Sequence, residues 1–195
     1  MKLEPIKFYT TKDEHGYMSN FARYKIDCFG RVWQTSEHAY QAQKFTGMNV
    51  EDYDAVFRAD RPMVAAALGR DPNRPIRPDW DSVKDDVMRF VVFHKFMQNP
   101  KIREKLLSTG DAPLFEYDTV RGDTYWAINR HGHGKNMLGV ILMEVREVLR
   151  ENDQFFIEHD NLVLNCEECQ NSGAQCPEHE RCVSPASLYI MSCKF

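Results

Sequence analysis

Glu37, Gln41 and Lys44 recur at a spacing that places a carboxylate and an amine on one face of a helix. With about 3.6 residues per turn, positions i, i+4 and i+7 face the same direction. Thr35 is a suitable N-cap, and the pattern predicts a helix that runs from it to about Phe45. The segment therefore predicts an acid and an amine held near each other by one element.

The chemistry open to this pair depends on its surroundings. Tyr40 and Phe45 flank the polar stripe, and an amine among aromatic side chains loses its proton more readily and becomes a nucleophile. Glu37 would then transfer protons for it. The same spacing also fits a solvated helix face with an ordinary acid and amine, and the residues alone leave both interpretations open.

The loop from His131 to Asn136 contains two glycines and precedes a helix predicted to begin at Met137. Glycines allow the backbone to approach a ligand, and free N–H groups at a helix start favour an anion. Lys135 adds positive charge. The loop therefore resembles a phosphate cradle, and it fits a flexible turn before a capped helix equally well.

Four aromatic residues lie beside predicted turns or element boundaries: Trp33, Trp80, Tyr125 and Trp126. Aromatic side chains at such positions either stack on a planar base or close a hydrophobic core.

The segment after residue 150 is polar and rich in cysteine. Its spacing predicts a structural zinc site, with loose thiols as the alternative. The candidate ligands are Cys166, Cys169, Cys176 and Cys182, with His179 as an alternative ligand.

The remaining patterns indicate a mainly helical α+β fold with small antiparallel strands. We expect one domain over residues 1–150 and a cysteine-rich appendage over residues 151–195. Strands are predicted near residues 6–9, 114–117 and 123–128, with a hairpin turning near Gly30. Helices are predicted near residues 50–59, 62–69, from Asp79 or Asp81 to about 98, 101–107 and 137–150.

Composition narrows the class of partner. The chain has 195 residues, 43% of them hydrophobic, and a formal net charge of -4. No global positive field would attract nucleic acid, and the arginines between residues 58 and 77 alternate with aspartates, as on a solvated surface. With no signal-peptide pattern and no membrane span in the sequence, we expect a soluble, cytoplasmic protein with reduced thiols.

Taken in order, these segments resemble the NADAR, or YbiA-like, family over about residues 7 to 150. The motifs that carry the resemblance are Ser19-Asn20-Phe21, Trp33, Thr35-Ser36-Glu37-His38, Gln41-Ala42-Gln43-Lys44-Phe45, Trp80-Asp81, Lys95-Phe96, Glu116, Tyr125-Trp126 and Asn136-x-Leu138-Gly139.

The resemblance implies N-glycosidase activity with no cofactor for catalysis. Family substrates are ribosylamino-pyrimidine phosphates of riboflavin biosynthesis, or ADP-ribose attached to guanine, with nucleic acid only as the carrier. Glu37 and Lys44 are then the catalytic candidates, with Lys44 forming a Schiff base with the sugar. The implied substrate-binding residues are Ser19, Asn20, Trp80, Glu116, Trp126 and Asn136.

The chain departs from the family at one point. The family commonly continues the Tyr-Trp pair with Gly-Asp, whereas Trp126 is followed here by Ala127 and Ile128. We therefore expect an acidic group that holds a sugar hydroxyl or a proton to be absent, which bears on substrate choice. Two alternatives to an active enzyme are a catalytically weak module that binds ADP-ribose or a nucleotide, and a platform whose tail recruits a partner.

Overall fold

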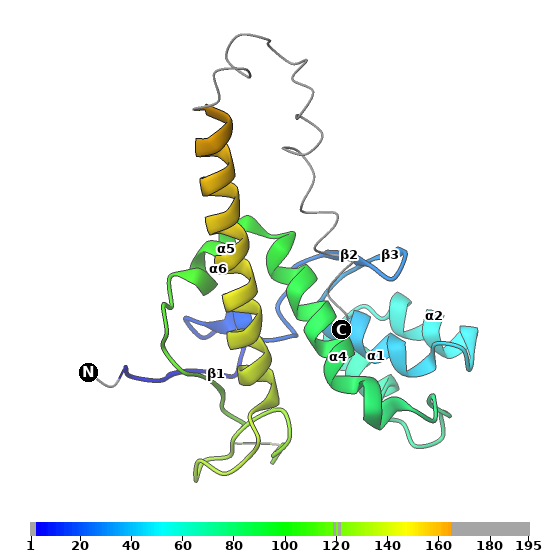
Figure 1. Ribbon diagram of the computed structural model, residues 1–195. Helices are drawn as coiled ribbons and strands as arrows, with labels where there is room; N and C mark the ends of the chain where they lie inside the picture. Colours follow the sequence, from blue (N-terminus) through cyan, green and yellow to red (C-terminus); the bar gives the residue numbers. More distant parts are fainter. Residues whose placement is uncertain (1–2, 119, 121, 165–195) are drawn as a thin grey trace, which may run out of the picture. The chain divides into compact units, whose positions relative to one another are not determined.

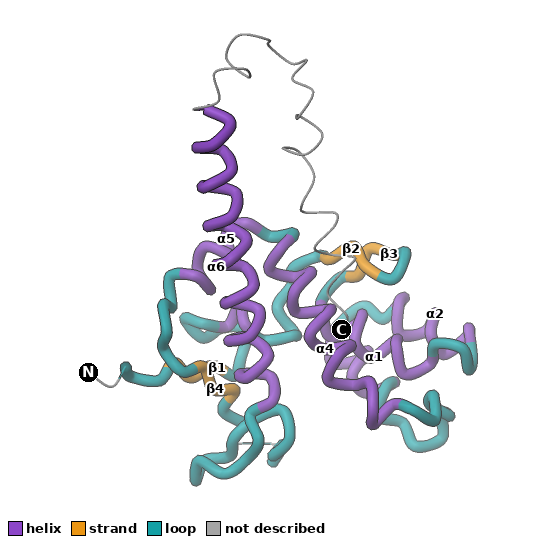
Figure 2. Tube along the Cα trace, in the orientation of Figure 1, coloured by secondary structure: helices purple, strands orange, loops and turns teal. Residues whose placement is uncertain are grey.

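The computed structural model describes residues 3–118, 120 and 122–164, and it contains two compact units, Met1–Arg146 and Glu147–Phe195. All residues discussed below as part of the site belong to the first unit. Figures 1 and 2 show the elements, which are β1 (Ile6–Phe8), η1 (Gly16–Met18), β2 (Ile26–Cys28), β3 (Arg31–Trp33), α1 (Ser36–Ala42), η2 (Gln43–Phe45), α2 (Val50–Arg58), α3 (Pro62–Leu68), α4 (Trp80–Met97), α5 (Pro100–Leu107), β4 (Leu114–Glu116) and α6 (Met137–Leu164).

The two small sheets differ in direction. β2 and β3 form the predicted antiparallel hairpin, whose turn uses positive φ angles at Phe29 and Gly30. β1 and β4 pair in parallel, with Ile6 opposite Leu114. The prediction of antiparallel strands is therefore right for the hairpin and wrong for this pair. Residues 123–128 do not form the predicted strand, because only Ile128 makes an isolated bridge.

The helices begin where the sequence signals them. α3 and α5 each have a proline at the first turn, where the missing N–H has no intrahelical partner to lose. α6 is longer than predicted and runs from Met137 to Leu164. Among the described residues, no helix combines the length and apolar character that a membrane span requires.

The core of the first unit surrounds α1, which contacts α2, α3 and α4. Ala39 and Ala42 are fully buried, and their small side chains allow the neighbouring helices to approach closely. Trp33 is also fully buried and packs edge-on against Tyr53 and Phe57. Of the four candidate aromatics, Trp33 therefore belongs to the core.

A buried lysine on α4 holds the loop between η1 and β2. Lys95 is fully buried, and its Nζ donates to the carbonyl oxygens of Ser19, at 2.8 Å, and Met18, at 3.3 Å. Burial lowers the pKa of Lys95 to about 7. Lys95 thereby satisfies the Met18 carbonyl and is a second donor to the Ser19 carbonyl, which also accepts from the Ala22 N–H, and this fixes the Ser19-Asn20 segment.

Asn136 joins β4 to the start of α6. Its side-chain oxygen accepts from the N–H of Glu116 at 3.0 Å, and its amide donates to the carbonyl of Leu114 at 2.8 Å. Its φ of 55° lies in the left-handed region, which asparagine tolerates better than most residues. Asn136 therefore combines an unusual backbone conformation with two hydrogen bonds to the sheet.

Replacing Asn136 should separate these two contributions. Asn136→Ala removes both hydrogen bonds and strains the backbone, so we expect the free energy of unfolding to fall by about 2–4 kcal/mol. Asn136→Gly loses the same bonds without strain, so it should be more stable than the alanine variant by about 1 kcal/mol. Urea unfolding measures both values. An alanine variant as stable as the parent would contradict this role.

Candidate active site

Helix α1 is the centre of the candidate site because every one of its residues is buried. Thr35 caps it: the hydroxyl accepts from the His38 N–H and lies 2.8 Å from His38 Nδ1. Glu37 is only 5% exposed. The interpretation of this segment as a solvated helix face is therefore wrong, and Glu37 is a carboxylate held inside the protein.

The Glu37 carboxylate and backbone are held by residues of two segments. Gln41 Nε2 donates to Glu37 Oε1 at 2.9 Å, which is the predicted i, i+4 contact. The Glu37 N–H donates to the carbonyl of Asn20 at 3.1 Å. Ser36 in turn donates to the side-chain oxygen of Asn20 at 3.0 Å. The Ser19-Asn20 segment and the first turn of α1 therefore position each other.

Lys44 lies two residues beyond the end of α1, in the short 3₁₀ segment η2. Its Nζ donates to the carbonyl of Gly69 at 2.7 Å and lies 5.6 Å from the centre of the Trp80 ring. Burial is the main cause that lowers the pKa of Lys44 to about 8, with Arg70 adding to this effect and Glu37 opposing it. A substantial fraction of this amine is therefore neutral near physiological pH.

Glu37 and Lys44 line adjoining cavities. The cavity around Glu37, here called the central cavity, has a volume of about 90 Å³ and is also lined by Ser19, Asn20 and Glu116. The cavity around Lys44, here called the lysine cavity, has a volume of about 560 Å³ and is also lined by Trp80, Lys84 and Tyr125. The two share Tyr40, Gln41, Arg70, Asp123 and Trp126.

Three aromatic rings, those of Tyr40, Trp80 and Trp126, lie together in the lining of the lysine cavity. Tyr40 lies 5.1 Å from Trp80 and 5.6 Å from Trp126, measured between ring centres. Asp123 holds the Trp126 backbone by accepting its N–H at 2.9 Å. Trp80, Tyr125 and Trp126 thus line a cavity, unlike Trp33.

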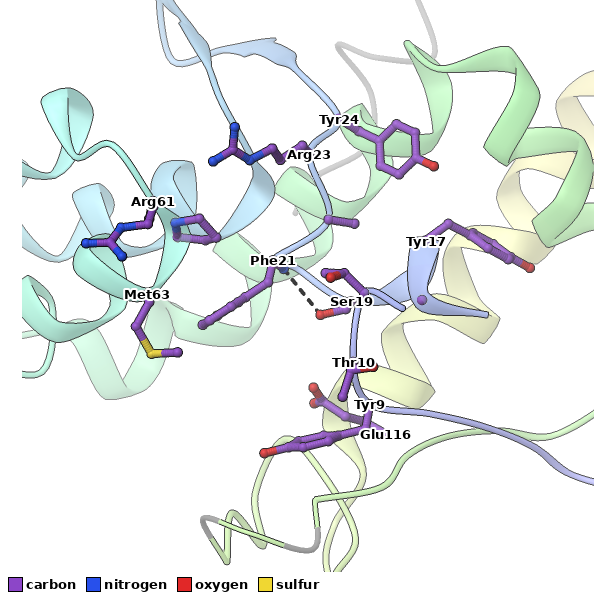
Figure 3. Close-up of a pocket in the computed structure, with 14 residues that line it drawn as sticks. Tyr9, Thr10, Tyr17, Ser19, Phe21, Arg23, Tyr24, Arg61, Met63 and Glu116 are labelled. Atoms are coloured by element: carbon purple, nitrogen blue, oxygen red, sulfur yellow. Dashed lines mark hydrogen bonds between the residues drawn. The ribbon is translucent and has the colours of Figure 1, made fainter. Parts of the chain in front are cut away.

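A third hollow adjoins the central cavity. This hollow, here called the arginine groove, has a volume of about 760 Å³ and shares Tyr9, Ser19, Phe21 and Glu116 with the central cavity. Arg23, Tyr24, Arg61 and Met63 complete the part of it that Figure 3 shows. Sequence reasoning missed this groove, since its residues come from separate segments without a shared motif.

Acidic groups line the central cavity despite the Ala127-Ile128 departure. Glu116, Asp118 and Asp123 lie in its wall together with Glu37. Ile128 is buried, and its backbone pairs with Glu116 and Asp118. Position 128 therefore lacks the acidic side chain that the family commonly has there, while other acidic residues lie in the cavity wall.

The start of α6 does not offer the predicted phosphate cradle. The Met137 N–H donates to the carbonyl of Tyr125 at 3.0 Å, and the Leu138 N–H donates to that of Trp126 at 3.1 Å. Asn136 is bound to β4 and is not among the lining residues of the three cavities. The loop therefore serves to anchor Tyr125 and Trp126, and its geometry favours a structural role for Asn136.

Of the other predicted site residues, Asn20 lines the central cavity and Trp80 lines the lysine cavity, while two cavities each are lined by Ser19, Glu116 and Trp126. Arg70 was missed, because its position among alternating arginines and aspartates resembles a solvated surface. The predicted zinc ligands Cys166, Cys169, Cys176, Cys182 and His179 lie outside the described residues.

The fold and site together define a small α+β protein with a buried acid beside a partly buried amine. The NADAR domain model matches residues 7–150. The chain is 46% identical over 144 residues to N-glycosidase YbiA of Escherichia coli (strain K12), covering 74% of this chain and 88% of that protein. It is 42% identical over 146 residues to N-glycosidase Npun_R5314 of Nostoc punctiforme, covering 74% of this chain and 92% of that protein.

Two further similarities extend this result. The chain is 41% identical over 149 residues to the riboflavin biosynthesis protein VVA0006 of Vibrio vulnificus, covering 76% of this chain and 40% of that protein. The NMR structure of E. coli YbiA superposes with a TM-score of 0.71 at 44% identity, covering 79% of this chain and 89% of the other. The protein belongs to the NADAR family, and it is a hydrolase that acts on N-glycosyl bonds.

Gly69 connects both catalytic candidates. Its carbonyl accepts from Lys44, and a Cβ at this position would overlap the side-chain amide of Gln41, which holds Glu37. We expect Gly69→Ala to displace this flexible amide and to lower kcat about tenfold, with little change in melting temperature. Steady-state kinetics and thermal unfolding measure the two effects.

A double-mutant cycle identifies the route of this effect. If Gly69→Ala acts through Gln41, it should change kcat little when Gln41 is already alanine, because coupled residues are not additive. Equal losses in both backgrounds would show that the amide contact is not the cause.

Proposed function

We propose that the protein hydrolyses the bond between a ribosyl anomeric carbon and an exocyclic amine, through a Schiff base on Lys44. The observation that carries the proposal is the lowered pKa of Lys44, about 8, in a cavity that adjoins the buried Glu37. The substrate that we favour is a ribosylamino-pyrimidine phosphate. One relative, VVA0006, is named a riboflavin biosynthesis protein, which supports this choice. ADP-ribosylated guanine is the second candidate.

The proposed reaction begins when the sugar ring opens. The lone pair of the glycosidic nitrogen forms a double bond to the anomeric carbon, the ring C–O bond breaks, and the ring oxygen takes a proton from Glu37. The neutral amine of Lys44 then adds to the anomeric carbon, which is now bonded to two nitrogens. Glu37 returns to its charged form and can accept a proton from the attached lysine nitrogen.

Expulsion of the base completes the first half of the reaction. A proton moves to the nitrogen of the base, the bond from this nitrogen to the anomeric carbon breaks, and its electron pair leaves with the base amine. A double bond remains between the sugar and Lys44. Water adds to this carbon, and the lysine amine leaves, so that one water is consumed per bond cleaved.

Borohydride should trap the sugar on Lys44 during turnover. Reduction converts the Schiff base into a stable secondary amine, so mass spectrometry of peptides should show the sugar adduct on Lys44 with whichever of the two substrates is hydrolysed. Lys44→Ala should give neither adduct nor turnover, and Glu37→Gln should lose turnover while remaining folded. A fully active protein that never yields the adduct would exclude the covalent route.

The pH dependence of kcat/KM should report the protonation of Lys44. Since the neutral amine attacks, kcat/KM should rise with pH along a limb that reflects a pKa of about 8. Arg70 lowers this pKa, so Arg70→Ala should move the rising limb to higher pH. Arg58→Ala, which removes an exposed arginine outside the three cavities, should leave the limb in place. A limb that Arg70→Ala does not move would argue against Lys44 as its origin.

A further inference from the structure

The central cavity is too small to hold a whole substrate. Its volume of about 90 Å³ is well below the range of about 300–1,000 Å³ that small-ligand pockets have. The lysine cavity and the arginine groove, at about 560 and 760 Å³, are each in the range of about 300–1,000 Å³ that small ligands occupy. A substrate whose reacting carbon lies near Glu37 and Lys44 therefore has room to extend into both hollows, each of which shares lining residues with the central cavity.

The lysine cavity suits the planar base of the substrate. Trp80, Tyr125 and Trp126 offer ring faces on which a heteroaromatic base can stack. A phosphate placed beside Lys44 would raise the pKa of this amine and remove the neutral form that the proposed reaction needs. The other lysine of this cavity, Lys84, already binds Asp81 at 2.9 Å.

The arginine groove suits an anion. Arg23 is exposed and forms no ion pair with any residue in the described part of the chain. Arg61 pairs with Asp60 at 3.3 Å, but both side chains are about 70% exposed, so the pair is weak and easily exchanged. Guanidinium groups bind phosphate through two parallel hydrogen bonds. Both arginines are therefore available to a phosphate group.

Positively charged and acidic side chains lie in different parts of the groove. Figure 3 shows Arg23 and Arg61 in one part of the groove, and Tyr9 and Glu116 in another. Glu116 also lines the central cavity, so the acidic part adjoins the reaction centre. A carboxylate suits sugar hydroxyls, and the arginines suit a negatively charged group at the end of the sugar.

We propose that the arginine groove binds the phosphorylated arm of the substrate, with Arg23 and Arg61 contacting the phosphate, while the base lies in the lysine cavity. This assignment rests on the proposed function, because it presumes a substrate with a sugar phosphate on one side and a planar amine on the other. The phosphate could belong to a ribose 5-phosphate group or to the pyrophosphate of ADP-ribose.

Calorimetric titration with ribose, ribose 5-phosphate and ADP-ribose tests the assignment without turnover. The parent protein should bind ribose 5-phosphate at least tenfold more tightly than ribose, and Arg23→Ala and Arg61→Ala should each remove most of this advantage. If the two variants weaken ADP-ribose more than ribose 5-phosphate, the groove is suited to the pyrophosphate source. Similar losses for both ligands indicate a site for the single phosphate.

Controls separate the groove from the lysine cavity. Arg58→Ala should bind all three ligands as the parent does, and diaminohydroxypyrimidine, a probe for the base, should bind Arg23→Ala and Arg61→Ala within twofold of the parent. If the phosphate advantage persists in these two variants but is lost in Lys84→Ala or Arg70→Ala, the phosphate lies in the lysine cavity and the assignment is wrong.

Failure of this inference differs from failure of the proposed function. A parent protein that hydrolyses a ribosylamine phosphate but binds ribose 5-phosphate no better than ribose contradicts the groove assignment alone. A parent that shows the arginine-dependent advantage but cleaves neither candidate substrate contradicts the proposed reaction and leaves the phosphate site intact.

Discussion

The site depends on the burial of a carboxylate inside α1. An acid removed from water destabilises the fold unless hydrogen bonds compensate for the lost solvation. The Glu37 carboxyl group has such support from Gln41, and the Glu37 backbone is held separately by the Asn20 carbonyl. Asn20 is in turn bonded to Met88 of α4 and to Ser36, so the surroundings of the acid connect several parts of the unit.

The same constraint acts on the amine. Lys44 follows α1 directly, and its Nζ contacts the end of α3 through the carbonyl of Gly69. The side chain of Gln41 fills the space that a larger residue at position 69 would occupy. Contacts of α1 with α3 thus set both the position of the acid and the environment that lowers the pKa of Lys44. The same contacts between α1 and α3 therefore contribute to the packing of the core and to the reactivity of Lys44.

Local sequence patterns predicted much of this arrangement. The N-cap Thr35, the spacing of Glu37 and Gln41 and the prolines that begin two helices are short-range signals, and the structure confirms the elements they predict. The predicted orientation of Lys44, on the same helix face as Glu37, was less accurate. Because the chain tightens into a 3₁₀ segment after Ala42, the i+7 position no longer follows α-helical geometry, and Lys44 lines the neighbouring cavity.

Long-range pairing could not be predicted in this way. The parallel contact between β1 and β4 brings together residues more than a hundred positions apart, and it places Tyr9 beside the segment of Glu116. Asp118 and Asp123 line the central cavity, and the Asp123 N–H donates a hydrogen bond to the Asp118 side chain. No helix or strand periodicity in the sequence predicts that these residues line a cavity. The sequence therefore predicted Glu37 and Glu116 as site residues, whereas the contribution of Asp118 and Asp123 to the cavity became visible only in three dimensions.

The distribution of tryptophan has a practical consequence. The chain contains three tryptophans. Trp33 is enclosed in the core, whereas Trp80 and Trp126 line the lysine cavity and both contact Tyr40. A planar molecule that enters this cavity must alter the surroundings of two of the three indole rings. The protein thus has an intrinsic fluorescent reporter of occupancy, with Trp33 as a nearly constant background.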